Sequence, residues 1–313
     1  MQSDSQHILV LEPYYGGSHK AFLDGLQQQL EPFHFRFRLL SLPARKWKMR
    51  MQLAAPCFAE RIKELIIQGN CFDCILTSTF LDVPVLRSLL AGQGIHLPLV
   101  MYFHENQFTY PGQVPDPGMF QFTSINFTSA LCADRLAFNS RYNLETFLDG
   151  IHRYLKKSSD MKLHYLEEQI QAKSVILSPG IDFQPIDDAL SEKTAAEDLD
   201  IPVLVWNHRW EHDKDPDTFF QTLFALAEEY SFQLIVLGQH FRDRPEIFSR
   251  AETVLADRLL HFGYAESREE YARLLGRGDY IVSTARHELF GISAMEGVRA
   301  GCRAVVTDCL SYK

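Results

Sequence analysis

Two glutamates, Glu288 and Glu296, are separated by seven residues and follow an apolar run at residues 280–283. Gly291 lies between them at a predicted helix start, where its backbone N–H group and that of Ile292 would be free to bind a phosphate. Glu288 would lie at the mouth of this helix. Glu296 would lie at least a turn inside it, within reach of a neutral polyol such as a ribose. The pattern favours a site for a phosphorylated sugar; the alternative is an amphipathic helix with two solvated glutamates.

A pair of basic residues, Arg209 and Lys214, follows the apolar run at residues 203–207 and precedes a helix that Pro216 could open. A planar guanidinium and a flexible ammonium in one loop suit a diphosphate, whose negative charge grows as it leaves. The alternative is a pair of solvated surface cations. Both this loop and the two-glutamate segment follow strands of one predicted sheet, so we expect them at the same sheet edge.

The N-terminal half offers polar residues in equivalent places. Gly16 and Gly17 follow the first apolar run and lead into a helix, an arrangement that suits an anion or simply a tight turn. His104 follows a later apolar run, with Glu105 and Asn106 directly after it. A single histidine at a strand end is as compatible with a structural role as with a functional one.

A basic segment at residues 36–50 contains six Lys or Arg and no acid. Cations could follow the phosphates of a nucleic acid, and an aromatic ring among them could stack on a base. The alternative is a basic loop and helix surface without a ligand. The members that carry the nucleic-acid hypothesis are Arg45, Lys46, Trp47 and Lys48.

Short apolar runs alternate with helical patterns along the whole chain, which predicts parallel α/β architecture. The polar character of residues 186–200 predicts a linker between an N-terminal domain at 1–185 and a C-terminal domain at 201–313. We therefore expect two Rossmann-like, doubly wound sheets that face a central cleft, with ligands at the carboxyl ends of the strands. The expected strands are 7–11, 35–40, 74–78, 97–103, 135–139, 174–178, 203–207, 233–237, 259–262, 280–283 and 304–307.

The overall composition fits a soluble globular protein of 313 residues, with 46% hydrophobic residues and a net charge of −9. No apolar run is long enough to span a membrane, and the polar first residues do not form a secretory signal. The six cysteines follow no disulfide spacing, so a reduced, cytoplasmic setting is expected. Cys71 and Cys74 lack a second pair that would complete a zinc site, and we expect no bound metal.

The C-terminal pattern resembles that of the retaining GT-B glycosyltransferases of the GT4 type. The resemblance implies that Arg209 and Lys214 hold the diphosphate of a nucleotide-sugar donor. It further implies that Glu288 contacts the transferred sugar and Glu296 the ribose, and that Phe262 belongs to a segment that contacts the nucleobase. Such enzymes need no metal for this step.

Literal matches in the N-terminal half narrow the resemblance. The segments "YGGSHK", "LPARKWKMR", "YFHENQ" and "FNS" occur in an order similar to that of the tRNA-queuosine mannosyltransferase family. This resemblance implies transfer of mannose from GDP-mannose to the cyclopentenediol of queuosine in tRNA. In that setting His104 is expected to contact the donor sugar or the acceptor hydroxyl. His19, Glu105 and Asn106 are expected on the acceptor side, and Gly16 and Gly17 near the donor.

One departure from the GT4 pattern is that the chain stops soon after its last expected strand, so we expect a shortened C-terminus. Two alternatives stay open: a GT4-type enzyme with another acceptor, and a non-catalytic protein that binds nucleotide or tRNA. The sequence leaves the oligomeric state open.

Overall fold

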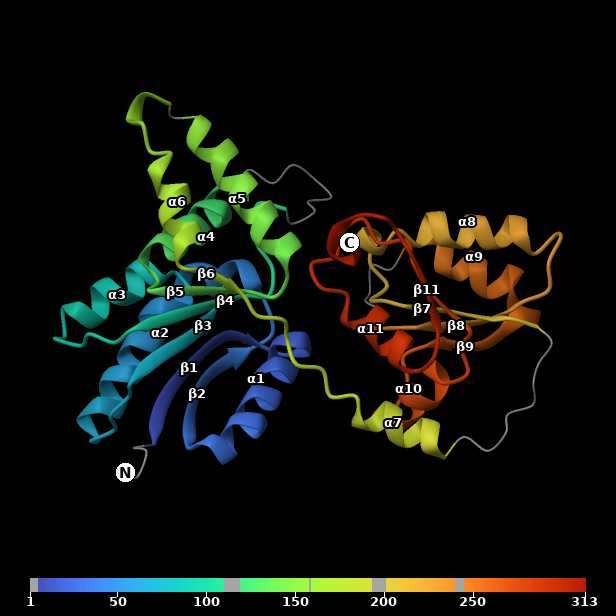
Figure 1. Ribbon diagram of the computed structural model, residues 1–313, viewed down its shortest axis with the longest axis horizontal. Coiled ribbons are helices and arrows are strands. Elements are labelled where there is room, and N and C mark those ends of the chain that lie inside the picture. Colours follow the sequence, from blue (N-terminus) through green and yellow to red (C-terminus); the bar gives the residue numbers. More distant parts are fainter. Residues whose placement is uncertain (1–4, 110–118, 158, 193–200, 240–244) are drawn as a thin grey trace. The chain divides into compact units, whose positions relative to one another are not determined.

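The computed structural model describes residues 5–109, 119–157, 159–192, 201–239 and 245–313. The chain divides into two compact units, Met1–Gly180 and Ile181–Lys313. Each unit contains one wholly parallel sheet with helices between its strands (Figure 1).

The first unit contains a six-stranded sheet of order β2-β1-β3-β4-β5-β6. Its strands are β1 (Gln6–Tyr15), β2 (Phe35–Pro43), β3 (Cys74–Ser78), β4 (Leu99–Phe103), β5 (Arg135–Phe138) and β6 (Ser174–Ile176). Its helices are α1 (Gly17–Leu30), α2 (Trp47–Ile67), α3 (Val83–Ala91), α4 (Met119–Cys132), α5 (Arg141–Lys156) and α6 (Tyr165–Ala172).

Side chains of these strands alternate between two hydrophobic clusters, as the two-residue period of a strand requires. Leu9 and Met101 belong to the large cluster that includes helix α2, whereas Leu76 and Tyr102 pack with Phe22 of helix α1 on the other side. Both faces of the sheet are therefore covered, and the carboxyl ends of the strands remain as the edge where loops can carry function.

The second unit contains a five-stranded sheet of order β11-β10-β7-β8-β9. Its strands are β7 (Val203–Asn207), β8 (Gln233–Leu237), β9 (Leu259–Gly263), β10 (Tyr280–Ser283) and β11 (Arg303–Val306). Its helices are α7 (Gln184–Ser191), α8 (Pro216–Leu226), α9 (Ile247–Val254), α10 (Arg268–Leu275) and α11 (Ile292–Arg299). An aromatic cluster on one face contains Trp206, Trp210, Phe220 and Phe248, with the Trp210 and Phe248 rings stacked at 4.1 Å.

The strand predictions are confirmed in place and order, although β1 runs four residues past the predicted end at Leu11. The prediction of a linker at residues 186–200 is wrong for residues 186–191, because they belong to helix α7. Ile186 of this helix is fully buried in the core of the second unit, and the units divide at Gly180 instead. The acidic residues of α7 give the segment a polar composition, so the sequence pattern does not reveal its one buried residue. The rest of the predicted linker, residues 193–200, lies outside the described residues.

Across the described residues, none of the helices has the length and apolar character that crossing a membrane requires.

Candidate functional site

Hydrogen bonds tie the loop after β7 to the loop after β10. The Thr284 hydroxyl donates to the backbone carbonyls of Lys214 and Asp215, both at 3.0 Å. The backbone N–H of Arg286 donates to the carbonyl of Asp213 at 2.8 Å. Because these strands are neighbours in the sheet, the two loops with predicted function meet at one sheet edge, as expected.

This contact brings Lys214 and Glu288 together. The Lys214 ammonium donates to the His287 carbonyl at 2.8 Å and to Glu288 Oε2 at 3.3 Å, and lies 3.3 Å from Asp213. Burial is the largest single influence and would raise the pKa of Glu288, but the Lys214 charge and the hydrogen bonds from Lys214 and the Phe290 backbone together hold the pKa below its usual value. Glu288 is therefore an anion in the folded protein.

The N-terminus of helix α11 is partly used by the protein itself. Gly291 has φ 88°, a left-handed conformation that favours glycine, and its N–H donates to Glu288 Oε1 at 3.1 Å. The prediction that this N–H is free for a phosphate is therefore wrong, because Glu288 accepts its hydrogen bond. Ile292 begins the helix as predicted.

The second glutamate, Glu296, is also held by protein groups. Arg268 and Tyr271 of helix α10 donate hydrogen bonds to its two carboxylate oxygens. The Asn207 amide at the end of β7 donates to the Tyr271 hydroxyl at 2.7 Å. Glu296 is buried, so the alternative of a solvated glutamate on an amphipathic helix is excluded. Arg268, Tyr271 and Asn207 were not among the predicted site residues.

The side chains of Arg209 and Phe262 differ in how accessible they are to a ligand. The Arg209 side chain is 55% exposed and forms an ion pair with Glu211 at 3.1 Å, so its guanidinium is at the surface. The Phe262 ring packs against Trp210, with ring centres 4.8 Å apart. The predicted nucleobase contact of the segment that contains Phe262 stays a prediction; Tyr264 in the same segment is exposed.

His208, between the aromatic cluster and Lys214, is an uncharged group. Burial, with the Lys214 charge as a second cause, lowers the pKa of His208 to about 4. Its backbone carbonyl is packed against Gly238, where an added Cβ would lie 1.7 Å from that oxygen. This close approach of the loops after β7 and β8 fixes the start of the Arg209–Lys214 loop.

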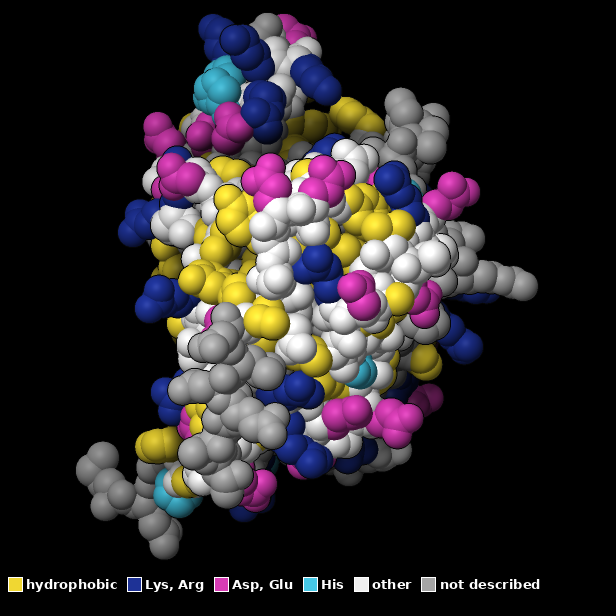
Figure 2. Space-filling view, turned by 90° about the vertical axis from the view of Figure 1, so that its right-hand side faces the viewer, with side chains coloured by type: hydrophobic (Ala, Val, Ile, Leu, Met, Phe, Trp, Pro, Cys, Tyr) yellow, Lys and Arg dark blue, Asp and Glu magenta, His cyan; other side chains and the backbone are white. Residues whose placement is uncertain are grey.

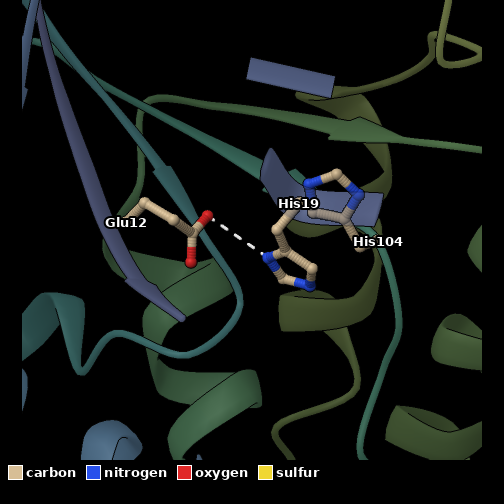
Figure 3. A group of neighbouring side chains, drawn as sticks. All are labelled: Glu12, His19 and His104. Carbon is tan, nitrogen blue, oxygen red and sulfur yellow. Dashed lines mark hydrogen bonds and ion pairs between the residues drawn. The ribbon is translucent and has the colours of Figure 1, made fainter. Parts of the chain in front are cut away.

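In the first unit, His19 joins two carboxylates that come from different elements. Figure 3 shows its contact with one of them, Glu12, and the neighbouring His104. Its Nδ1 lies 3.2 Å from Glu12 Oε2, and its Nε2 lies 3.3 Å from Glu105 Oε2. Ser78 donates to Glu12 at 3.0 Å and Thr79 donates to Glu105 at 2.7 Å. Residues from β1, α1, β3 and the loop after β4 thus form one polar network at the carboxyl edge of the sheet.

His104 lies against His19, with ring centres 4.0 Å apart. Burial first, and then the charge on His19, lower the pKa of His104 well below its usual value. Burial also disfavours a charge on His19, but Glu12 and Glu105 outweigh it and raise the pKa of His19 to about 10. The pair therefore consists of one charged and one neutral imidazole.

Among the described residues, one group has donor atoms close enough to consider a metal ion. These are Glu12, His19 and His104, whose donor atoms all lie within 4.8 Å of one another. Both ring nitrogens of His19 already face carboxylate oxygens, so in this arrangement the ring offers two N–H donors and no lone pair. These residues are better suited to keep His19 protonated than to bind a metal ion.

Asn106 does not belong to this network, so its predicted role in substrate binding is wrong. It is fully buried, its amide donates to the Asn143 side chain at 2.8 Å, and its oxygen accepts from the N–H groups of Phe108 and Thr109. Asn106 instead shapes the loop that presents His104 and Glu105.

The Gly16–Gly17 turn leads into helix α1, whose first turn has no side-chain cap. A Cβ at Gly16 would lie 2.5 Å from Cβ of Ala44, so this turn packs against the segment before helix α2. The requirement for glycine at position 16 is therefore explained by packing. Gly17 has φ 52° and open space where a side chain would be.

The basic segment begins beside this turn. Arg45, Lys46 and Lys48 are exposed, and Lys46 adopts a left-handed conformation just before helix α2. Trp47 is half-buried: its ring packs at 5.1 Å from Phe122 and 5.9 Å from Phe80. The prediction that Trp47 stacks on a base stays a prediction.

Phe80 connects the basic segment to the group formed by Glu12, His19, His104 and Glu105, called the histidine network below. The Phe80 ring also stacks on the His19 ring, with ring centres 5.4 Å apart. A surface rich in exposed cations thus lies close to His19 and Glu105 within one unit. On the face of the second unit in Figure 2, basic and acidic side chains are instead interspersed. The exposed cations of the basic segment make this part of the first unit a candidate surface for a polyanion.

Glu12 is the main residue of the first unit that the sequence did not single out. An acid directly after a buried strand is the signal that could have found it, since burial of a carboxylate requires a partner. Its partner His19 is seven residues away on the following helix, and only the strand–turn–helix geometry brings the two together.

Sequence comparisons place the chain in a family. The first unit matches the family described as "tRNA-queuosine alpha-mannosyltransferase N-terminal" at residues 7–181, and residues 189–313 match "Glycosyl transferases group 1". The chain is 35% identical over 317 residues to the tRNA-queuosine alpha-mannosyltransferase of Drosophila melanogaster, covering 100% of this chain and 82% of that protein.

Solved structures show the fold. The catalytic domain of starch synthase IV from Arabidopsis thaliana gives a TM-score of 0.70 at 11% identity, covering 99% of this chain and 84% of that one. The Anabaena protein HepE in complex with UDP gives a TM-score of 0.64 at 15% identity, covering 98% of this chain and 82% of that one. The fold is that of the GT-B glycosyltransferases, and on the sequence matches the chain belongs to the tRNA-queuosine alpha-mannosyltransferase family.

Proposed function

We propose that this protein transfers mannose from GDP-mannose to the cyclopentenediol of queuosine in tRNA, with retention of configuration. The observation that carries the proposal is the 35% identity to the Drosophila tRNA-queuosine alpha-mannosyltransferase along the whole of this chain. The cytoplasm, where tRNA is modified and thiols stay reduced, is the proposed setting.

The donor side of the proposal rests on the second unit. Lys214 and Arg209 would neutralise the departing diphosphate, and Glu288 would hold hydroxyls of the sugar. The Lys214–Glu288 ion pair at 3.3 Å supports this assignment, because one contact fixes both a phosphate-binding cation and a sugar-binding acid. Glu296, oriented by Arg268 and Tyr271, would contact the ribose. In this scheme protein cations stabilise the leaving group and no divalent metal is needed there.

The acceptor side rests on the first unit. Arg45, Lys46 and Lys48 would bind tRNA phosphates. His104 and Glu105 would contact the acceptor hydroxyl; the neutral state of His104 supports this, because a neutral imidazole can accept a hydrogen bond from a hydroxyl.

The test is transfer of labelled mannose from GDP-mannose to matched tRNA pools with and without queuosine, read by nucleoside mass spectrometry. A hexose that appears only on queuosine is the expected result. Transfer to both pools, or from UDP-sugars but not from GDP-mannose, would contradict the proposed acceptor or donor. A parallel reaction with EDTA tests metal independence, and unchanged transfer is expected.

A further inference from the structure

The proposed acceptor contacts involve His104 and Glu105, but the histidine network of the first unit also includes His19. His19 lies in the first turn of helix α1, is only 5% exposed, and has each ring nitrogen within 3.3 Å of a different carboxylate. A neutral imidazole has one N–H and one lone pair, so one of these contacts would place a lone pair against an anionic oxygen. Only the doubly protonated ring donates to both carboxylates.

The two carboxylates are fixed independently of His19. Glu12 Oε1 accepts from the Ser78 hydroxyl and, at 2.8 Å, from the backbone N–H of Tyr14. Glu105 Oε1 accepts from the Thr79 hydroxyl. These neutral donors hold both carboxylates in place but carry no charge, and a cation is needed to compensate the buried Glu12 and the partly buried Glu105. Within the described residues, His19 is the cationic side chain that lies in hydrogen-bonding reach of both.

His104 is the neighbour on which this charge acts. Its ring lies 4.0 Å from the His19 ring, 5.0 Å from the Phe22 ring and 4.7 Å from the Tyr102 ring. The titratable groups that face the pair are Glu12 and Tyr14 from β1, Glu105 from the loop after β4, and Tyr102 from β4, whose hydroxyl donates to the Leu177 carbonyl. Two like charges so close in a partly buried place repel, so a proton on His19 excludes a second one on His104.

We propose that His19 is a positioning residue for the acceptor side of the site: as an imidazolium between Glu12 and Glu105, it fixes Glu105 and keeps His104 neutral. The inference rests on the proposed function in one respect, namely that His104 and Glu105 contact the acceptor. A neutral His104 can accept a hydrogen bond from the acceptor hydroxyl, whereas a protonated His104 can only donate.

The first experiment measures the protonation state directly and does not depend on activity. The full chain, labelled with ¹⁵N in its histidines, is studied by NMR, with the His19 signals assigned from the His19→Gln variant. Both ring nitrogens of His19 are expected to stay protonated at pH 8. A single neutral tautomer at pH 7.5 would overturn the proposal.

The same sample also tests a metal. Addition of one equivalent of ZnCl₂ is expected to leave the His19 signals unchanged. A stoichiometric shift of the His19 and His104 signals, with release of a proton, would overturn the proposal in favour of a metal site at Glu12, His19 and His104.

The second experiment compares the pH dependence of kcat for mannosyl transfer in the wild type, His19→Gln and the control His152→Gln. His152 is an exposed histidine with a ring nitrogen 3.2 Å from Glu167, so the control removes a histidine–carboxylate pair far from the network in sequence. Wild type and control are expected to have level profiles between pH 6 and 8. In His19→Gln, His104 becomes the group that takes up the proton, and kcat should fall as the pH is lowered from 8 to 6, by up to about fourfold for an ordinary imidazole pKa of about 6.5.

An equal loss at every pH would show a merely structural role and would overturn the proposal. If His19→Gln does not fold, Glu12→Gln replaces it in the NMR experiment. Loss of one carboxylate should then lower the pH at which His19 loses its proton, and an unchanged midpoint would count against the inference. Absence of any transfer by the wild type would refute the proposed function alone, since the NMR result stands without it.

Discussion

The Lys214 ammonium lies 3.3 Å from the Glu288 carboxylate, although the two positions are 74 apart in the sequence. Both side chains are largely buried, so the pair is shielded from solvent and fixed in orientation. Removal of Lys214 leaves Glu288 and Asp213 without their cation, whereas removal of Glu288 leaves Lys214 with Asp213 as a partner. Variants of Lys214 and Glu288, made singly and together, can therefore measure what the pair contributes to stability separately from its role in activity.

The double change of Lys214 to Met and Glu288 to Gln should destabilise the protein less than the sum of the two single changes. The expected coupling is about 1–3 kcal/mol by urea denaturation at pH 7. The pKa of Glu288 is lower in the folded state than in the unfolded state. Its contribution to the free energy of unfolding is therefore present above the unfolded-state pKa and is lost as the pH falls through the folded-state pKa. The difference between wild type and Lys214→Met should therefore shrink at low pH. Additive effects of the two changes would contradict a direct interaction.

Arg209→Ala should reduce transfer by about 100-fold or more with little effect on stability, because an exposed ion pair contributes little to folding. The measurements are kcat/KM for the donor and the melting temperature. Arg153→Ala is the matched control, since Arg153 is also exposed and paired with an acid, Asp149. Equal losses of activity and stability in Arg209→Ala would be incompatible with a role at the diphosphate.

Tyr271→Phe should raise KM for the donor several-fold with little change in kcat, because it removes one hydrogen bond that orients Glu296. Steady-state kinetics with varied GDP-mannose provide the measurement. Tyr230→Phe, on an exposed tyrosine, is the control. A change in kcat alone would place Tyr271 elsewhere in the reaction.

The triple change of Arg45, Lys46 and Lys48 to Ala should weaken tRNA binding and reduce the slope of log K against log salt by about 2–3. Filter binding between 50 and 200 mM KCl is the measurement. Lys63→Ala is the control, because Lys63 is an exposed cation on the same helix outside the basic segment. An unchanged salt dependence in the triple variant would show that tRNA binds elsewhere.

His19 should stabilise the fold most at low pH. Its pKa is about 10 in the folded protein and about 6.5 when unperturbed, so the contribution is fully present below 6.5 and is lost as the pH rises towards 10. The difference in melting temperature between wild type and His19→Gln should therefore be larger at pH 6 than at pH 9.5. A difference that grows with pH would have the wrong sign for a stabilising imidazolium.

The sequence by itself determined the order and type of the secondary structure. Buried parallel strands such as Cys74–Ser78 and Tyr280–Ser283 are short, continuous apolar runs, and this local pattern also locates the loops at their carboxyl ends. Lys214, Glu288 and His104 were found in this way. The pattern failed at α7, where one buried residue, Ile186, holds an otherwise polar helix to the core.

Only the tertiary structure decided which side chains meet. Burial distinguishes Glu105, which joins His19, from Asn106 beside it, which is enclosed in its own loop. The partners of Glu296 on helix α10, and the contacts of His19 with Glu12 and Glu105, depend on segments that are separate in the chain. Spacing along the sequence fixes the position of a residue on its element, but charge states depend on burial and on neighbours that only the packed sheet brings together.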